Sequence, residues 1–173
     1  IENRAGAVIL CDHSFIGSHK YETDFPVTQL DEQISLLQKN GFRFISFEEF
    51  IAGKRSGSRN VLITIDDGNV SAFFAYRTVL KKAGIRPLFA IYPSAVGKRS
   101  YAMNWEQIRE LSVDGCTIAS HGFSHQRMDD AAMLANPAMI EREIRVSKRI
   151  IEDNTEKTVE AFVYPFGAHG RGI

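Results

Sequence analysis

The sequence predicts an α/β fold with a parallel sheet. Short apolar runs alternate with amphipathic helical patterns along the chain, which indicates βαβ units with right-handed crossovers. Several runs are continuously apolar, as expected for strands that are buried on both faces of a parallel sheet. Either a barrel or a doubly wound open sheet fits this alternation.

The predicted elements follow one another in regular order. The apolar runs that predict strands are Ala7–Cys11, Phe42–Ser46, Val61–Ile65, Leu88–Tyr92, Thr117–Ser120 and Ala161–Tyr164. The helical patterns are Thr28–Asn40, Ser46–Ala52, Val70–Ala83, Asn104–Val113 and Pro137–Asp153. Thr28 is the expected cap of the first helix, and Gly41 its stop. In the last helix, one stripe is formed by Ile140, Ile144, Ser147 and Ile151.

The composition is that of a single globular domain, expected to cover residues 1–173. Lys plus Arg equals Asp plus Glu, and the zero net charge argues against a nucleic acid partner. No apolar run approaches the ~20 residues that would span a bilayer. The polar stretch 53–60 is expected to be a surface loop, and Cys11 and Cys116 two buried free thiols.

Polar residues gather where the predicted strands end. The first strand runs into Asp12-His13 and the third into Asp66-Asp67-Gly68. The fifth runs into His121-Gly122-Phe123-Ser124-His125, and the sixth into Pro165-Phe166-Gly167. Because the carboxyl ends of parallel strands share one rim, this convergence is the main evidence in the sequence for an active site.

Asp66 and Asp67 cannot both face the same way, since side chains alternate along a strand. One carboxylate can therefore bind a metal while the other stands free to accept a proton. Taken alone, Asp-Asp-Gly is equally explained as a helix cap. His121 and His125, four residues apart, can share one face of a helical turn and bind one cation, or be two surface histidines. Gly122 in the spacer favours a shaped loop.

Together these residues offer two imidazoles and one carboxylate. Zinc in hydrolytic sites is commonly held by three such ligands, and non-haem iron takes the same set. The turn Tyr164-Pro165-Phe166-Gly167 could aim a backbone N–H at a developing oxyanion, or be an ordinary turn with a packed ring. Among the aromatic residues, Tyr101 and Phe123 lie in predicted loops and are the better candidates to contact a ligand.

The three segments Thr64–Gly68, Ser120–His125 and Tyr164–Gly167 resemble, in order and interval, the three leading motifs of the polysaccharide deacetylase family, carbohydrate esterase family four. Residues 104–108 are also similar to many members. The stretch from Asp12 to Phe42 is similar to the branch that contains the deacetylases of poly-β-1,6-N-acetylglucosamine, a biofilm polymer.

The resemblance implies a distorted (β/α)7 barrel and a hydrolase that removes N-acetyl groups from an N-acetylglucosamine polysaccharide outside the cytoplasm. It makes Asp67, His121 and His125 the ligands of a divalent metal, usually Zn²⁺. It makes Asp66 the general base that deprotonates metal-bound water, and the backbone N–H of Phe166 an oxyanion donor. His13, Tyr164 and Pro165 would line the substrate cleft.

The resemblance also has departures. No Arg stands shortly before Pro165, and no counterpart of the family's later motifs, which supply the general acid, follows the third motif. The sequence therefore predicts a barrel whose C-terminal part is missing from the 173 residues. It also leaves open an alternative function, a catalytically inactive carbohydrate-binding protein of the same fold.

Overall fold

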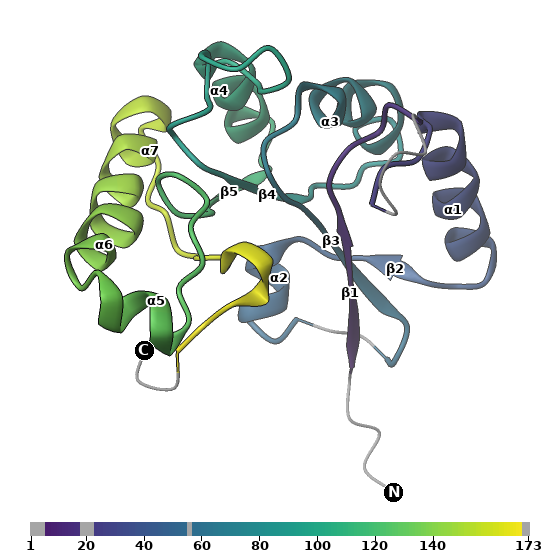
Figure 1. Cartoon of the computed structure of the whole chain (residues 1–173). Coiled ribbons are helices and arrows are strands. Elements are labelled where there is room, and N and C mark those ends of the chain that lie inside the picture. The colour runs from purple at the N-terminus through teal and green to yellow at the C-terminus, as the bar shows by residue number, and fades with distance from the viewer. Residues whose placement is uncertain (1–5, 18–22, 55–56, 171–173) are drawn as a thin grey trace, which may run out of the picture.

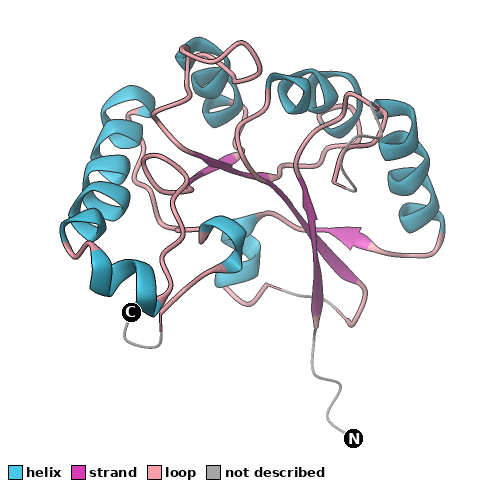
Figure 2. Cartoon of the chain, viewed as in Figure 1, coloured by secondary structure: helices cyan, strands magenta, loops and turns pink. Residues whose placement is uncertain are grey.

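The computed structural model describes residues 6–17, 23–54 and 57–170. The predicted α/β architecture with a parallel sheet is confirmed (Figure 1). The strands are β1 (Ala7–Asp12), β2 (Arg43–Phe44), β3 (Asn60–Ile65), β4 (Leu88–Ile91) and β5 (Thr117–Ser120). They run in the order β1-β3-β4-β5, with β2 also paired to β3, and every pairing between them is parallel. Most helices lie along one side of this sheet, whereas the short helix Phe47–Ile51 lies on the other side (Figure 2).

The helices occupy most of the predicted positions. They are α1 (Val27–Lys39), α2 (Phe47–Ile51), α3 (Val70–Ala75), α4 (Trp105–Val113), α5 (Asp130–Ala135), α6 (Ala138–Ile140) and α7 (Ser147–Thr155). Two π-helical segments, η1 (Tyr76–Leu80) and η2 (Glu141–Val146), continue α3 and α6, and η3 (Pro165–Gly167) is one 3₁₀ turn. The predicted helix 137–153 is therefore one continuous helical region with a π segment inside it.

Capping explains where several helices begin. Asn104 and Gln107 form a reciprocal capping box at the start of α4, and Ser46 and Glu49 do the same for α2. The predicted Thr28 cap is wrong. Helix α1 begins at Val27, one residue earlier, and its N-cap residue is Pro26. No side chain donates or accepts a capping hydrogen bond there. The fixed φ of Pro26 instead restricts the backbone where the helix starts.

The core lies between the sheet and the outer helices. All side chains of β4 are buried, as are all those of β3 apart from half-buried Thr64, as predicted for a strand covered on both faces. Tyr76 packs edge-to-face on Phe89 and joins η1 to β4. In the described part of the chain, no helix is long and apolar enough to cross a membrane.

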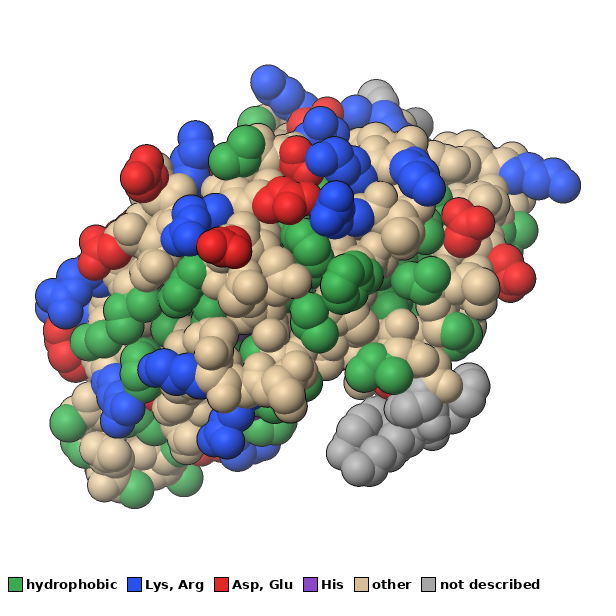
Figure 3. Space-filling view, turned by 90° about the horizontal axis from the view of Figure 1, so that it is seen from above, with side chains coloured by type: hydrophobic (Ala, Val, Ile, Leu, Met, Phe, Trp, Pro, Cys, Tyr) green, Lys and Arg blue, Asp and Glu red, His purple; other side chains and the backbone are tan. Residues whose placement is uncertain are grey.

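Two further predictions need correction. Residues 161–164 do not form a full strand: Phe162 makes one isolated bridge to Ser120, flanked by two backbone hydrogen bonds. Cys11 is exposed, and only Cys116 is buried. The reason is that β1 is an edge strand, paired only with β3 among the described residues, so that Val8 and Ile9 are also about half exposed. On the face shown in Figure 3, basic and acidic side chains are interspersed, as the zero net charge leads one to expect.

Candidate metal centre and active site

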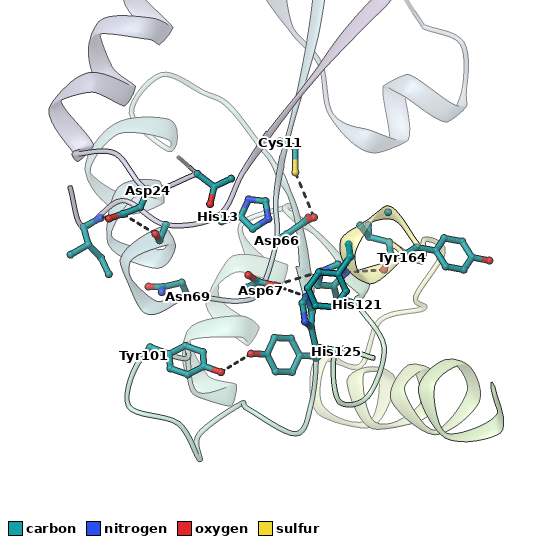
Figure 4. Close-up of a pocket in the computed structure, with 17 residues that line it drawn as sticks. Cys11, His13, Asp24, Asp66, Asp67, Asn69, Tyr101, His121, His125 and Tyr164 are labelled. Atoms are coloured by element: carbon teal, nitrogen blue, oxygen red, sulfur yellow. Dashed lines mark hydrogen bonds and ion pairs between the residues drawn. The ribbon is translucent and has the colours of Figure 1, made fainter. Parts of the chain in front are cut away.

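The end of β3 separates two adjacent carboxylates. The backbone N–H of Asp66 donates to the carbonyl of Asp12 at 2.9 Å and so extends the β1–β3 ladder by one residue. Asp67 then adopts a left-handed conformation with φ of 69°. Gly68 follows with φ of 66°, and a Cβ there would lie 3.1 Å from Ile91. As a result Asp66 faces Cys11, whereas Asp67 faces the histidines (Figure 4).

The two histidines lie at the end of β5 and in the loop that follows it. The backbone N–H of His121 donates to the Ile91 carbonyl at 2.8 Å, which fixes the residue to the end of β4. Its ring Nδ1 lies 2.8 Å from the Val163 carbonyl, so Nδ1 carries the proton and the Nε2 lone pair is free to bind a metal. His125 has φ of 59°, so the pair sits on a shaped loop, as Gly122 indicated, and not on a helix face.

A buried carboxylate holds this loop. Glu143 is 1% exposed and its Oε2 accepts the backbone N–H groups of Phe123 at 2.7 Å and Ser124 at 2.9 Å. Its Oε1 accepts the Ser124 hydroxyl at 2.6 Å. A Cβ at Gly122, whose φ is 77°, would lie 2.6 Å from Oε2. The glycine is thus required both for the turn and for the close approach of Glu143.

The side chains of Asp67, His121 and His125 lie together at this rim, and we call this candidate cation site the metal centre. Oδ1 of Asp67 lies 3.1 Å from Nε2 of His125 and 3.5 Å from Nε2 of His121. One ligand atom of each residue falls within 4.8 Å of the others. Oδ1 of Asp67 is buried, yet it accepts no hydrogen bond of good geometry from the residues that the structure describes. Two imidazole nitrogens and a carboxylate oxygen that face one point without hydrogen-bonding suit a divalent cation such as Zn²⁺ or Fe²⁺.

The electrostatics of the two carboxylates differ. Burial opposes ionisation of Asp67, but the two imidazoles outweigh it and the pKa of Asp67 is lowered. Burial dominates at Asp66, whose pKa is raised although His121 and His13 act against it. For His121, burial lowers the pKa, while Asp67 and Asp66 outweigh it and the net pKa is raised. Such neighbouring groups with opposite shifts are typical of acid–base sites.

These residues open onto a cavity of about 1000 Å³. Of the residues predicted for substrate contact, His13, Tyr164 and Tyr101 line it, as does Phe166. Pro165 is buried and does not belong to the described lining, and Phe123 instead lies under the Arg142 guanidinium, 4.4 Å from its ring centre. The remaining lining residues are Cys11, Ser14, Ile16, Thr23, Asp24, Asp66, Asp67, Asn69, Tyr92, His121, His125, Val163 and Gly167.

The turn after residue 164 places an aromatic ring beside the metal centre. Phe166 has φ of 59°, and the backbone N–H of Gly167 donates to the Tyr164 carbonyl at 3.0 Å. The Phe166 ring is 64% exposed and its centre lies 4.6 Å from that of the His125 ring. The third motif therefore forms one wall of the cavity.

Two features were not predicted. The first is a contact: the hydroxyls of Tyr92 and Tyr101, two aromatic residues near the predicted rim, lie 2.6 Å apart on the cavity wall. Glu143 lies three residues after Ile140 and four before Ser147, on the predicted apolar stripe. A charged residue in such a stripe was the available signal for a buried carboxylate with a structural partner.

The chain is similar to known proteins in sequence and in fold. The family model of polysaccharide deacetylases matches residues 53–173, more than half of the chain. The poly-β-1,6-N-acetyl-D-glucosamine N-deacetylase of Staphylococcus aureus (strain MRSA252) is 24% identical over 168 residues, covering 88% of this chain and 58% of that protein. The chain thus spans under two thirds of the length of the curated relatives that it matches.

Solved structures share the fold. The structure of IcaB from Ammonifex degensii superposes with a TM-score of 0.82 at 24% identity, covering 94% of this chain and 75% of that chain. A mutant of a family pseudoenzyme superposes less completely, with a TM-score of 0.52 at 19% identity over 62% of this chain and 37% of that chain. From the match of the family model, the chain belongs to the polysaccharide deacetylase family.

Proposed function

We propose that this protein is a metal-dependent N-deacetylase that hydrolyses N-acetyl groups of an N-acetylglucosamine polysaccharide. One observation carries the proposal: two imidazoles and one carboxylate converge at the strand ends, while a second, separate carboxylate stands beside them in the same cavity. The first set would hold Zn²⁺ or a similar cation. The second carboxylate is then free for proton transfer.

Asp66 would be the general base. Asp66 is 7% exposed, and its Oδ2 accepts a hydrogen bond from the Cys11 thiol at 3.5 Å. Its Oδ1 is buried and makes no hydrogen bond with the described residues. Oδ1 can therefore take the proton of an attacking water. The raised pKa brings Asp66 closer to neutrality, where a general base works best. When bound, the metal would supply Lewis acidity and ease the ionisation of water.

The other cavity residues would bind and orient the sugar. Tyr92, Tyr101 and Tyr164 offer rings for stacking and hydroxyls for hydrogen bonds to sugar hydroxyl groups. His13 would contact the substrate, Pro165 would fix the turn from behind, and the backbone N–H of Phe166 would donate to the oxyanion. These roles come from the motif positions together with the lining of the cavity.

We further propose a β-1,6-linked polymer as the substrate, and action outside the cytoplasm. The support is the similarity to the deacetylase named for this polymer, together with the likeness in fold to IcaB.

A carbohydrate-binding protein without turnover is the second candidate, because the family contains a pseudoenzyme. A binder needs the metal ligands at most. It does not need a buried carboxylate beside them, because burial without a partner costs free energy. The retention of Asp66 therefore favours the enzyme.

The test is acetate release from β-1,6-linked N-acetylglucosamine oligomers by zinc-loaded protein, with metal content measured on the same samples. Asp66→Asn should lower the rate about 10²–10⁴-fold, as loss of a general base does. It should keep the zinc bound at the metal centre, because Asp66 lies outside that centre. His125→Ala should lose both zinc and activity. Asp31→Asn, an exposed change on α1, is the control and should match the wild type.

Two results would count against the proposal. Zinc-loaded wild type that releases no acetate from β-1,6 or β-1,4 oligomers, but still binds them, would favour the binding protein. A His125→Ala protein with normal zinc content would remove that residue from the metal centre.

A further inference from the structure

A second group of metal-binding side chains lies on the other side of the Asp66-Asp67 pair. Cys11 and His13, from the end of β1, face Asp66, from the end of β3. One ligand atom of each residue lies within 4.8 Å of the other two. Figure 4 shows His13 and Cys11 next to Asp66, with Asp67 turned away toward the histidines. We call Cys11, His13 and Asp66 the cysteine site.

Two atoms of the cysteine site are buried without a partner. Nδ1 of His13 and Oδ1 of Asp66 make no hydrogen bond among the described residues, and Asp66 is 7% exposed. A buried polar atom with no partner is costly and usually points to a bound ion or water. The proposed role as a general base explains the unpartnered oxygen of Asp66. It explains neither the unpartnered nitrogen of His13 nor the presence of the Cys11 thiol beside them.

We propose that the cysteine site binds a second, soft divalent cation of the Zn²⁺ or Cd²⁺ class, separate from the metal centre. A thiolate, an imidazole and a carboxylate are the ligands that these ions prefer, whereas Mg²⁺ and Ca²⁺ select oxygen. Ligand atoms around one tetrahedral Zn²⁺ lie about 3.5 Å from one another. Cys11 Sγ and Asp66 Oδ2 already lie at 3.5 Å, so only small side-chain shifts are needed.

The consequence for activity rests on the proposed function. A cation bound at the cysteine site would be coordinated by the Asp66 carboxylate. The coordinated carboxylate would then accept a proton less readily, which opposes its role as a base. The metal centre would then activate the enzyme, and the cysteine site would inhibit it when zinc is in excess. Since general bases contribute about 10²–10⁴-fold, full occupancy should lower the rate about 10²-fold or more.

The binding test is a Cd²⁺ titration of reduced protein, followed by the thiolate-to-cadmium absorption band in the ultraviolet and by calorimetry. The wild type should bind two equivalents and show the band. Cys11→Ser should bind one equivalent and lose the band. Cys116→Ser, a change at the only other cysteine, should keep both. Asp67→Asn should weaken the metal centre and keep the band.

A wild type without the band, or a Cys11→Ser protein with an undiminished band, would overturn the cysteine site. The activity test then compares each variant with itself, at one equivalent of Zn²⁺ and at excess. The wild type should be inhibited about 10²-fold or more and Cys11→Ser by far less. Equal inhibition of both would overturn the inhibitory role. A band in a protein that releases no acetate at one equivalent would support the cysteine site while the proposed function fails.

Discussion

At the scale of single residues, the rim of the sheet holds carboxylates whose environments differ. Asp12 follows Cys11 at the end of β1 and, by strand alternation, faces the opposite side. Burial raises its pKa to about 6. A carboxyl group whose pKa is higher in the folded state binds protons more tightly there. Its contribution to stability is therefore present at low pH and falls as pH rises from about 4 to about 6.

Asp12→Asn should raise the free energy of unfolding at about pH 7 by roughly 1–3 kcal/mol, because the amide removes a charge that burial disfavours. The gain should vanish near pH 4, where the wild-type carboxyl is protonated. Urea unfolding at both pH values measures the difference. The control is Asp31→Asn, on the exposed face of α1, which should change the free energy of unfolding by the same small amount at both pH values. A gain of the same size at both pH values would show that burial of charge is not its cause.

At the scale of elements, the loop after β5 depends on a helix that is distant in sequence. Glu143 lies in the π-helical segment η2 and accepts three hydrogen bonds from the loop, all at 2.9 Å or less. Ser147, one turn further on, donates its hydroxyl to the Gly122 carbonyl at 2.8 Å. Because π segments are frequent at functional sites, we infer that η2 serves to aim Glu143 at the loop.

Glu143→Gln should cost about 2–3 kcal/mol of stability, because the amide places an N–H group against donors and loses charge-assisted hydrogen bonds. It should also weaken zinc binding at the metal centre about 10–100-fold, since His125 then loses its support. Thermal unfolding and zinc affinity measure the two effects. Glu141→Gln, exposed on the same helix, is the matched control. An unchanged zinc affinity would make Glu143 a purely structural residue.

The elements themselves were largely predictable, and the failures have physical causes. Apolar runs such as β3 and β4 are buried on both faces, so the sequence signal is strong. Residues 161–164 carry an equally apolar run, yet only one bridge forms, because pairing depends on a neighbouring strand and not on the run itself. Cys11 was misjudged for the same reason: β1 has one partner strand, which residue type cannot reveal.

At the scale of the whole molecule, the site was predictable as a set of residues but not as a geometry. Because the carboxyl ends of parallel strands share one rim, the sequence predicted that Asp66, Asp67, His121 and His125 lie close together, and in the structure they line one cavity. The sequence could not show that Asp66 turns toward Cys11, or that Glu143 supports the loop. The contact between Asp66 and Cys11 joins residues 55 positions apart, and the contacts of Glu143 with the loop join residues 19 or more positions apart. Both depend on the direction of side chains, which the sequence does not show.

The metal centre also links the parts of the fold. Its three residues come from the end of β3 and from the end of β5 and the loop after it, with β4 between them, so a bound cation would join strands that do not pair directly. The unfolded chain has no such arrangement, and binding therefore stabilises the folded state. In a Cys11→Ser background, which isolates the metal centre, Zn²⁺ at about 100 times its dissociation constant should add about 2.7 kcal/mol. For a chain of this size, that raises the melting temperature by about 5–10 °C.

Differential scanning calorimetry with and without zinc measures this shift, and chelation should reverse it. Adding Asp67→Asn to the same background should remove most of the shift, because the amide is a poorer ligand than the carboxylate and leaves two imidazoles alone. Ca²⁺ or Mg²⁺ at the same concentration should have little effect on either protein, since neither ion favours imidazole ligands. If the Asp67→Asn protein is stabilised by zinc as strongly as its parent, the cation binds elsewhere, and the three ligands do not act as one centre.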